Sequence, residues 1–137
     1  MAGRTPAFSI QLAVSDIGTT EAFYAGILEV AVERALTVTG APEHLVVRQS
    51  GCNVIFVDES DVVRAHPVLD ERLGSYVKGV GMTLHFTVED IDGIYDAVME
   101  EGMEILYPLQ VTPYGTKELW VFDPDGYLLV LEEKAAR

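Results

Sequence analysis

The sequence contains one cysteine, Cys52, among its 137 residues, so no disulfide bond can form within the chain. The lack of a second cysteine also excludes Cys-x-x-Cys metal and redox motifs, and it favours a reducing compartment such as the cytoplasm. No apolar run approaches the roughly 20 residues that a membrane-spanning helix needs. The N-terminus lacks the charged and then apolar pattern of a secretory signal. We therefore expect a cytoplasmic protein without a membrane partner.

Basic residues are scarce, because 9 lysines and arginines stand against 22 acidic residues and give a formal net charge of −13. Such a surface repels phosphate backbones, which argues against a nucleic-acid partner. It attracts cationic small molecules, although acidity by itself also serves solubility. Hydrophobic residues make up 49% of the chain, which is typical of a globular protein, and residues 1–137 have the length of one domain.

The two halves of the chain repeat one pattern, in which matching residues recur in the same order at a nearly constant offset. The matching pairs are Val14 and Val88, Asp16 and Asp90, Ile17 and Ile91, Glu43 and Glu118, Val46 and Val121, and Gly51 and Gly126. Each half predicts a strand, a helix and three further strands, and the opening strands alternate apolar and polar residues. The first module is expected at residues 7–58, a linker with a short helix around Asp70 at 59–81, and the second module at 82–133.

The expected elements follow from this alternation and from helical spacing of apolar residues. The helices are predicted at 19–28 and 92–101. The strands are predicted at 8–14, 30–38, 44–49, 53–58, 82–88, 104–109, 118–122 and 127–132. Residues from Ala135 onward are expected to fray.

Three motifs carry a family resemblance. They are Val14-Ser-Asp16 before Phe23-Tyr24, the segment 86–92, and the segment 114–127 with its Asp-Pro-Asp-Gly turn. With these motifs the chain resembles the glyoxalase/bleomycin-resistance (vicinal oxygen chelate) superfamily over about residues 7 to 133, and its pattern is closest to the metal-free bleomycin-resistance-like branch. The resemblance implies an α+β fold of paired βαβββ modules, whose curled mixed sheets surround a cavity, usually in a homodimer.

The resemblance also implies where a metal would be held, because enzymes of the superfamily place His, Gln or Glu on the first and last strands of each module. Those positions correspond to Ser9, Ile55, Thr83 and Val130. Two hydrocarbons and two neutral hydroxyls are poor ligands for a divalent ion. We therefore predict that the protein has no metal and needs no cofactor.

A second metal site remains open if the register is shifted by two residues, because Gln11, His85 and Glu132 then share the strand faces of the family positions. The favoured interpretation is that Gln11 and His85 are hydrogen-bonded polar residues of a wet cavity. His44, His66 and His85 show no His-x-His or His-x-x-x-His spacing.

The remaining candidates are ligand-binding residues. Glu118 and Trp120, the single tryptophan, alternate onto one strand face, and a ring beside a carboxylate suits a flat or cationic ligand. Trp120 is equally consistent with plain core packing. Tyr114 is placed in a loop that is suited to a lid or a dimer contact, and Ile55 belongs to the cavity wall. Cys52 has no basic partner in the sequence and is interpreted as an inert thiol.

Two functions follow. The first is a metal-independent protein that binds an aromatic or cationic small molecule in a cavity lined by the curled sheets, within a homodimer, as in antibiotic-resistance relatives. The second is an enzyme of the glyoxalase type, a lyase, isomerase or dioxygenase. It would use the shifted metal set or His85 as a catalytic general base.

Overall fold

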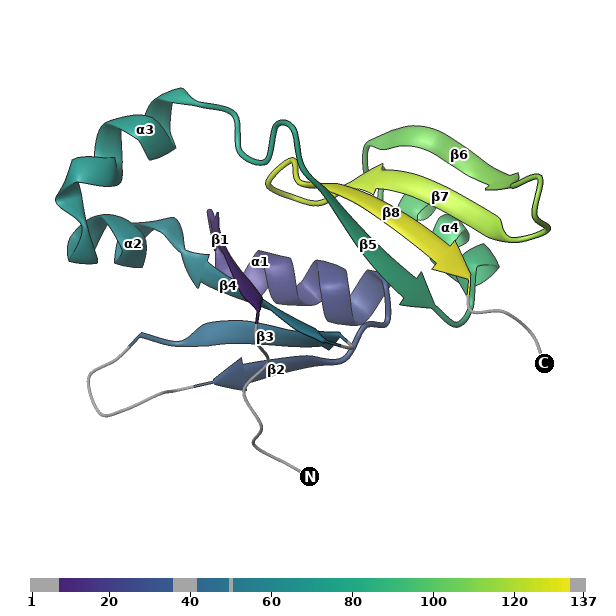
Figure 1. Ribbon diagram of the computed structural model, residues 1–137, viewed down its shortest axis with the longest axis horizontal. Coiled ribbons are helices and arrows are strands. Elements are labelled where there is room, and N and C mark those ends of the chain that lie inside the picture. The colour runs from purple at the N-terminus through teal and green to yellow at the C-terminus, as the bar shows by residue number, and fades with distance from the viewer. Residues whose placement is uncertain (1–7, 36–41, 50, 134–137) are drawn as a thin grey trace.

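The computed structural model describes residues 8–35, 42–49 and 51–133 and contains two four-stranded sheets. Sheet A has the order β1-β4-β3-β2, and sheet B has the order β5-β8-β7-β6 (Figure 1). The strands of sheet A are β1 (Ser9–Val14), β2 (Val32–Ala35), β3 (His44–Gln49) and β4 (Cys52–Asp58). Those of sheet B are β5 (Thr83–Val88), β6 (Ile105–Val111), β7 (Lys117–Phe122) and β8 (Leu128–Glu133).

The two sheets have the same topology. The first strand pairs in parallel with the last, β1 with β4 and β5 with β8, and the other pairs are antiparallel. The strand order therefore matches the βαβββ repeat expected from the sequence, and the α+β fold is confirmed. The predicted strand ends agree to within two residues wherever they are described. Residues 36–38 of one predicted strand, and those from Ala135 onward, lie outside the described residues.

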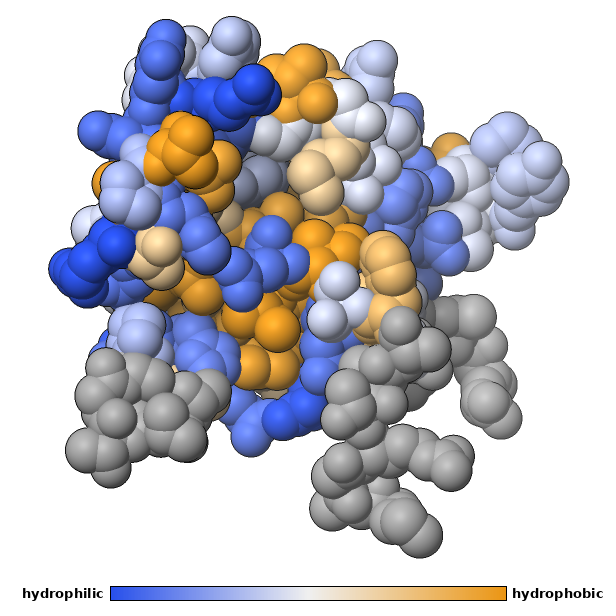
Figure 2. Space-filling view, turned by 60° about the vertical axis from the view of Figure 1, so that its left-hand side comes forward, coloured by the Kyte–Doolittle hydropathy of each residue, from blue (hydrophilic) through white to orange (hydrophobic). Residues whose placement is uncertain are grey.

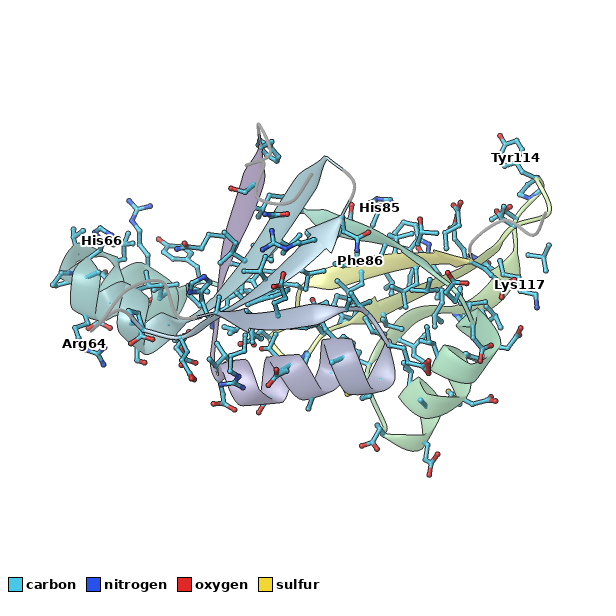
Figure 3. The ribbon with its side chains drawn as sticks, turned by 90° about the horizontal axis from the view of Figure 1, so that it is seen from below. Arg64, His66, His85, Phe86, Tyr114 and Lys117 are labelled. Carbon is cyan, nitrogen blue, oxygen red and sulfur yellow. The ribbon has the colours of Figure 1, made fainter. Side chains whose placement is uncertain are left out.

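Each sheet carries one main helix, and Figure 3 shows both helices on the same side of the sheets. Asp16 caps the start of α1 (Ile17–Glu21) by accepting from the Thr19 amide at 2.9 Å, and Asp90 caps α4 (Ile91–Glu100) through Gly93. The first helix continues as a π-helix, η1 (Ala22–Ile27), in which the Leu28 amide donates to the Phe23 carbonyl. The predicted helix at 19–28 thus changes its hydrogen-bond pattern halfway.

The segment between the sheets contains more helix than the sequence analysis anticipated. α2 (Glu59–Ala65) follows β4 directly, and a 3₁₀ turn, η2 (Pro67–Leu69), leads into α3 (Asp70–Ser75). The expected short helix around Asp70 is α3, whereas α2 was not predicted. Figure 1 shows these helices standing apart from α1 and α4, with an extended segment running from α3 to β5. No helix in the described ranges is long and apolar enough to cross a membrane.

One cluster of buried side chains includes residues from both sheets. Tyr24 of η1 lies at the junction, where its ring centroid is 4.7 Å from that of Phe56 in sheet A and 5.9 Å from that of Phe86 in sheet B. Its hydroxyl donates to Asp123 Oδ2 at 2.7 Å. The Tyr127 hydroxyl donates to the Ala13 carbonyl at 2.7 Å. The junction therefore combines apolar packing with buried hydrogen bonds.

Candidate functional site

Each sheet has one face against the core and one face, called here its open face, on the opposite side. In β1, Leu12 and Val14 are buried, whereas Gln11, which precedes them, is exposed; the register pairs Gln11 with Ile55 of β4. In β5, Leu84, Phe86 and Val88 are buried, whereas His85 is exposed. Figure 3 shows His85 pointing away from the helices while Phe86 points toward them. Gln11 and Ile55 therefore belong to the open face of sheet A, and His85 to that of sheet B.

The open face of sheet B gathers aromatic rings and carboxylates, and we call Tyr107, Glu118, Trp120 and Glu132 its aromatic–acidic face. The indole N–H of Trp120 donates to Glu118 Oε1 at 2.9 Å. The Tyr107 ring meets the Trp120 ring edge-on, with centroids 5.4 Å apart. Trp120 is partly exposed and lies outside the buried core cluster. Trp120 is therefore not a plain core residue, and its ring is accessible from the open face.

Two carboxylates of this face are neighbours. Glu118 of β7 and Glu132 of β8 are paired in the register of the sheet, so their side chains lie side by side on the open face. Like charges directly opposite each other on antiparallel strands destabilise the pair. No ion pair joins either of them to a lysine, arginine or histidine of the described residues. This strip of the face consequently favours a positively charged group.

Among the described residues, the hydrogen-bond partner of His85 is Thr83, whose hydroxyl lies 3.2 Å from its Nε2. The neighbouring position across the sheet is Val130, a buried hydrocarbon. The described surroundings of His85 therefore supply a hydroxyl but no acid or base at hydrogen-bond distance. As a catalytic candidate, His85 lacks an oxyanion-stabilising group among these contacts.

The four positions that the family resemblance marks for metal ligands all lie on the open faces. Ser9 and Ile55 lie on sheet A, and Thr83 and Val130 lie on sheet B. Isoleucine and valine have no lone pair to donate, so this set does not fit a divalent ion. The alternative set of Gln11, His85 and Glu132 is not brought together either. Gln11 lies on sheet A, and on sheet B the register pairs Glu132 with Thr87 rather than with His85. Within the described part of the chain, no group of three or more His, Cys, Asp or Glu side chains could hold a metal.

Tyr114 lies far from these residues. It occupies the turn between β6 and β7, where the hydroxyls of Thr112 and Thr116 lie 2.7 Å apart, and it is 90% exposed. Figure 3 shows it projecting from the end of the sheet, away from His85. The structure thus groups His85, Glu118, Trp120 and Glu132 on one face, places Gln11 and Ile55 on the other sheet, and leaves Tyr114 at a turn.

A pocket of about 470 Å³ lies beside β1, and among the sequence-predicted candidates Gln11 is the one that lines it. Figure 2 shows a hollow with a largely hydrophobic floor on the side of the molecule where α3 and sheet A come forward. The other lining residues are Leu12, Ala13, Leu69, Arg72, Leu73, Tyr76, Val77, Lys78, Gly79, Met82 and Tyr127. Most of them belong to the linker, which the sequence analysis did not assign to a site. The sequence signal for this pocket was the four-residue spacing of Leu69 and Leu73, which places two apolar side chains on one helix face close to Arg72.

Two polar groups that line this pocket, the Tyr127 hydroxyl and the Lys78 ammonium, contribute no uncompensated charge. Burial, with Asp123 nearby, raises the pKa of Tyr127 to about 12, so its hydroxyl stays protonated at neutral pH and keeps its bond to Ala13. Lys78 Nζ lies 2.8 Å from Glu59 Oε2 and 3.9 Å from Asp125 Oδ1, so its charge is compensated. Arg72 has no such partner among the described residues.

Comparison with known structures identifies the fold. A crystal structure of a Glyoxalase/bleomycin resistance protein/dioxygenase superfamily member from Sphaerobacter thermophilus has 21% identity and a TM-score of 0.61, over 96% of this chain and 98% of that one. A hypothetical protein from S. aureus has 15% identity and a TM-score of 0.70, over 96% of both chains. A glyoxalase-related enzyme from Fulvimarina pelagi has 18% identity and a TM-score of 0.65, over 96% of this chain and 89% of that one.

No curated protein matches the chain significantly. The family comparison is decisive, because the sequence model of this superfamily matches residues 8–131, which is nearly the whole chain and both βαβββ repeats. The protein belongs to the Glyoxalase/Bleomycin resistance protein/Dioxygenase superfamily.

Proposed function

We propose that the protein binds a flat, cationic small molecule without a metal, in a cavity bounded by the open faces of its sheets. The observation that carries the proposal is the composition of the open face of sheet B. It presents an indole ring and two adjacent carboxylates, and it has a hydroxyl and a hydrocarbon, Thr83 and Val130, where the family resemblance places metal ligands. The proposal includes a homodimer and a cytoplasmic location.

The charge of the ligand follows from Glu118 and Glu132. Two neighbouring carboxylates repel each other, and a bound cation would relieve that repulsion. The flat shape of the proposed ligand follows from Trp120, because a partly exposed indole ring can stack on a planar molecule. Its N–H is bonded to Glu118, so the ring lies beside that carboxylate. Stacking and cation–π attraction contribute roughly 0.5–2 kcal/mol at such sites. The net charge of −13 adds attraction for cations that is strongest at low ionic strength.

Thermal unfolding with a bleomycin-type compound and with ethidium, an aromatic cation, tests the ligand class. A ligand at a hundred times its Kd should stabilise the folded protein by about 2.7 kcal/mol. The double variant Glu118→Gln/Glu132→Gln should lose at least tenfold in affinity, because it removes both charges while keeping the side-chain size. Glu100→Gln, at the exposed end of α4, is the matched control and should bind like the wild type. If no aromatic cation shifts the midpoint, the ligand class is wrong.

Metal analysis tests the other half of the proposal. Protein purified without chelators should contain far less than one Ni, Zn, Mn or Fe per chain, and EDTA should leave the ethidium affinity unchanged. The donor set at Ser9, Ile55, Thr83 and Val130 is the reason for this expectation. One tightly bound metal per chain would overturn it and would favour the alternative, an enzyme of the glyoxalase type.

A further inference from the structure

The pocket beside β1 has a charge opposite to that of the protein as a whole. Of its twelve lining residues, two are basic and none is acidic, although the chain has 22 acidic and 9 basic residues. Because Glu59 compensates Lys78, the net local charge comes from Arg72. The pocket is therefore a local positive site on an acidic molecule.

Arg72 stands out among the basic side chains of the described ranges. The other five each lie within ion-pair distance of a carboxylate, at 2.5–2.9 Å, and they are Arg34, Arg48, Arg64, Lys78 and Lys117. Arg72 forms no such pair there and lines the pocket instead. A guanidinium offers a fork of N–H donors that matches a carboxylate in a bidentate contact.

Most of the remaining lining residues are apolar, and Gly79 among them packs against the core. Leu69, at the end of η2, and Leu73 of α3 are four residues apart, and Met82, which precedes β5, lines the same pocket. The backbone at Gly79 packs directly against the ring of Tyr127. Its φ is +76°, and an added Cβ would overlap that ring. This contact places the segment between α3 and β5 against the core. The cavity thus has a defined floor, and its volume lies within the roughly 300–1,000 Å³ of small-molecule sites.

We propose that this pocket binds a small amphipathic carboxylate, with its anionic group on Arg72 and its apolar body against Leu73 and Met82. The Gln11 amide lies at the same pocket and can donate a further hydrogen bond to the carboxylate. The site is distinct from the aromatic–acidic face in position and in charge preference, so it goes beyond the proposed function. The net charge of the protein does not prevent anion binding, because salt screens charges beyond roughly 8 Å at physiological ionic strength.

Calorimetric titration with three ten-carbon probes of different charge tests the proposal. Decanoate should bind at one site per chain, and decan-1-ol and decylammonium should bind at least tenfold more weakly. Arg72→Gln should weaken decanoate binding roughly tenfold, since it removes a charge-assisted contact. Arg72→Lys should retain much of the affinity because it keeps the charge. Arg64→Gln on α2 changes an exposed arginine that does not line the pocket, so it should bind decanoate as the wild type does.

The outcomes separate this site from the aromatic–acidic face. Trp120→Ala should leave decanoate affinity unchanged, and Arg72→Gln should leave ethidium affinity unchanged. Equal binding of decan-1-ol and decanoate, or an Arg72→Gln variant with wild-type decanoate affinity, would show that the pocket selects no anion. Absence of saturable decanoate binding to the wild type would also overturn the proposal.

Discussion

Asp123 is a buried carboxyl group at the junction between the sheets, and its hydrogen bonds account for its position. Its two oxygens accept from the Tyr24 hydroxyl at 2.7 Å and from the amides of Asp125 and Tyr127. Tyr24→Phe should lower the free energy of unfolding by about 1–3 kcal/mol, because it leaves a buried acceptor without its donor. Urea unfolding measures the change.

Tyr95 offers a matched control for this substitution. It lies partly buried on α4, and no hydrogen bond of its hydroxyl occurs within the described residues. Tyr95→Phe should change the free energy of unfolding by less than about 0.5 kcal/mol. Equal effects of the two substitutions would mean that the bond to Asp123 contributes nothing of its own.

The same carboxyl group makes stability depend on pH. Burial raises the pKa of Asp123 above its ordinary 3.8, and the bond from Tyr24 offsets part of that rise. A group whose pKa is higher in the folded state stabilises most below its unfolded pKa, and this contribution is lost as pH rises through the folded pKa. The free energy of unfolding of wild type minus that of Asp123→Asn should therefore fall from about pH 4 upward. Urea titrations at several pH values measure this difference, and a difference that rises with pH would contradict the prediction.

At the scale of elements, the close contact between Gly79 and the Tyr127 ring helps to hold the linker against the core. Gly79→Ala should destabilise the protein by roughly 1–3 kcal/mol, because φ is +76° and the new methyl group would overlap the Tyr127 ring. Gly74→Ala in α3 is the control, since nothing lies within 4 Å of its added Cβ and the change favours a helix. Thermal unfolding of the two variants should thus give shifts of opposite sign or of clearly different size. Similar midpoints for both would show that Gly79 does not anchor the linker.

Strand positions could be predicted from the sequence because each strand has one buried face, which imposes the alternation of Leu84, Phe86 and Val88. The π-helical half of the first helix could not, because its apolar spacing is compatible with either hydrogen-bond pattern. α2 buries no side chain, so it leaves no periodic apolar stripe in the sequence. Its acidic first turn, with Glu59 and Asp61, and Arg64 in its last turn were the remaining signals.

The part of the candidate site that could be predicted is the set of residues sharing one face of a strand, because strand alternation determines it. Trp120 and Glu118 were expected on one face, and the structure places them in hydrogen-bond contact. The pairing of Glu118 with Glu132 depends on the register between two strands, which neither strand encodes alone. The pocket could not be anticipated, because it brings Gln11 together with linker residues such as Arg72 that are distant in the sequence.

At the scale of the whole molecule, the two sheets share one core, which predicts a single unfolding transition. Val47 of β3 is fully buried in sheet A, whereas Trp120, the single tryptophan, reports on sheet B. Val47→Ala removes two buried carbon atoms and should cost roughly 2 kcal/mol. Trp120 fluorescence and far-ultraviolet circular dichroism should then shift together in urea. If the halves unfolded independently, the substitution would leave the tryptophan transition in place and move the circular dichroism alone, because Tyr24 and Asp123 would not then couple the sheets.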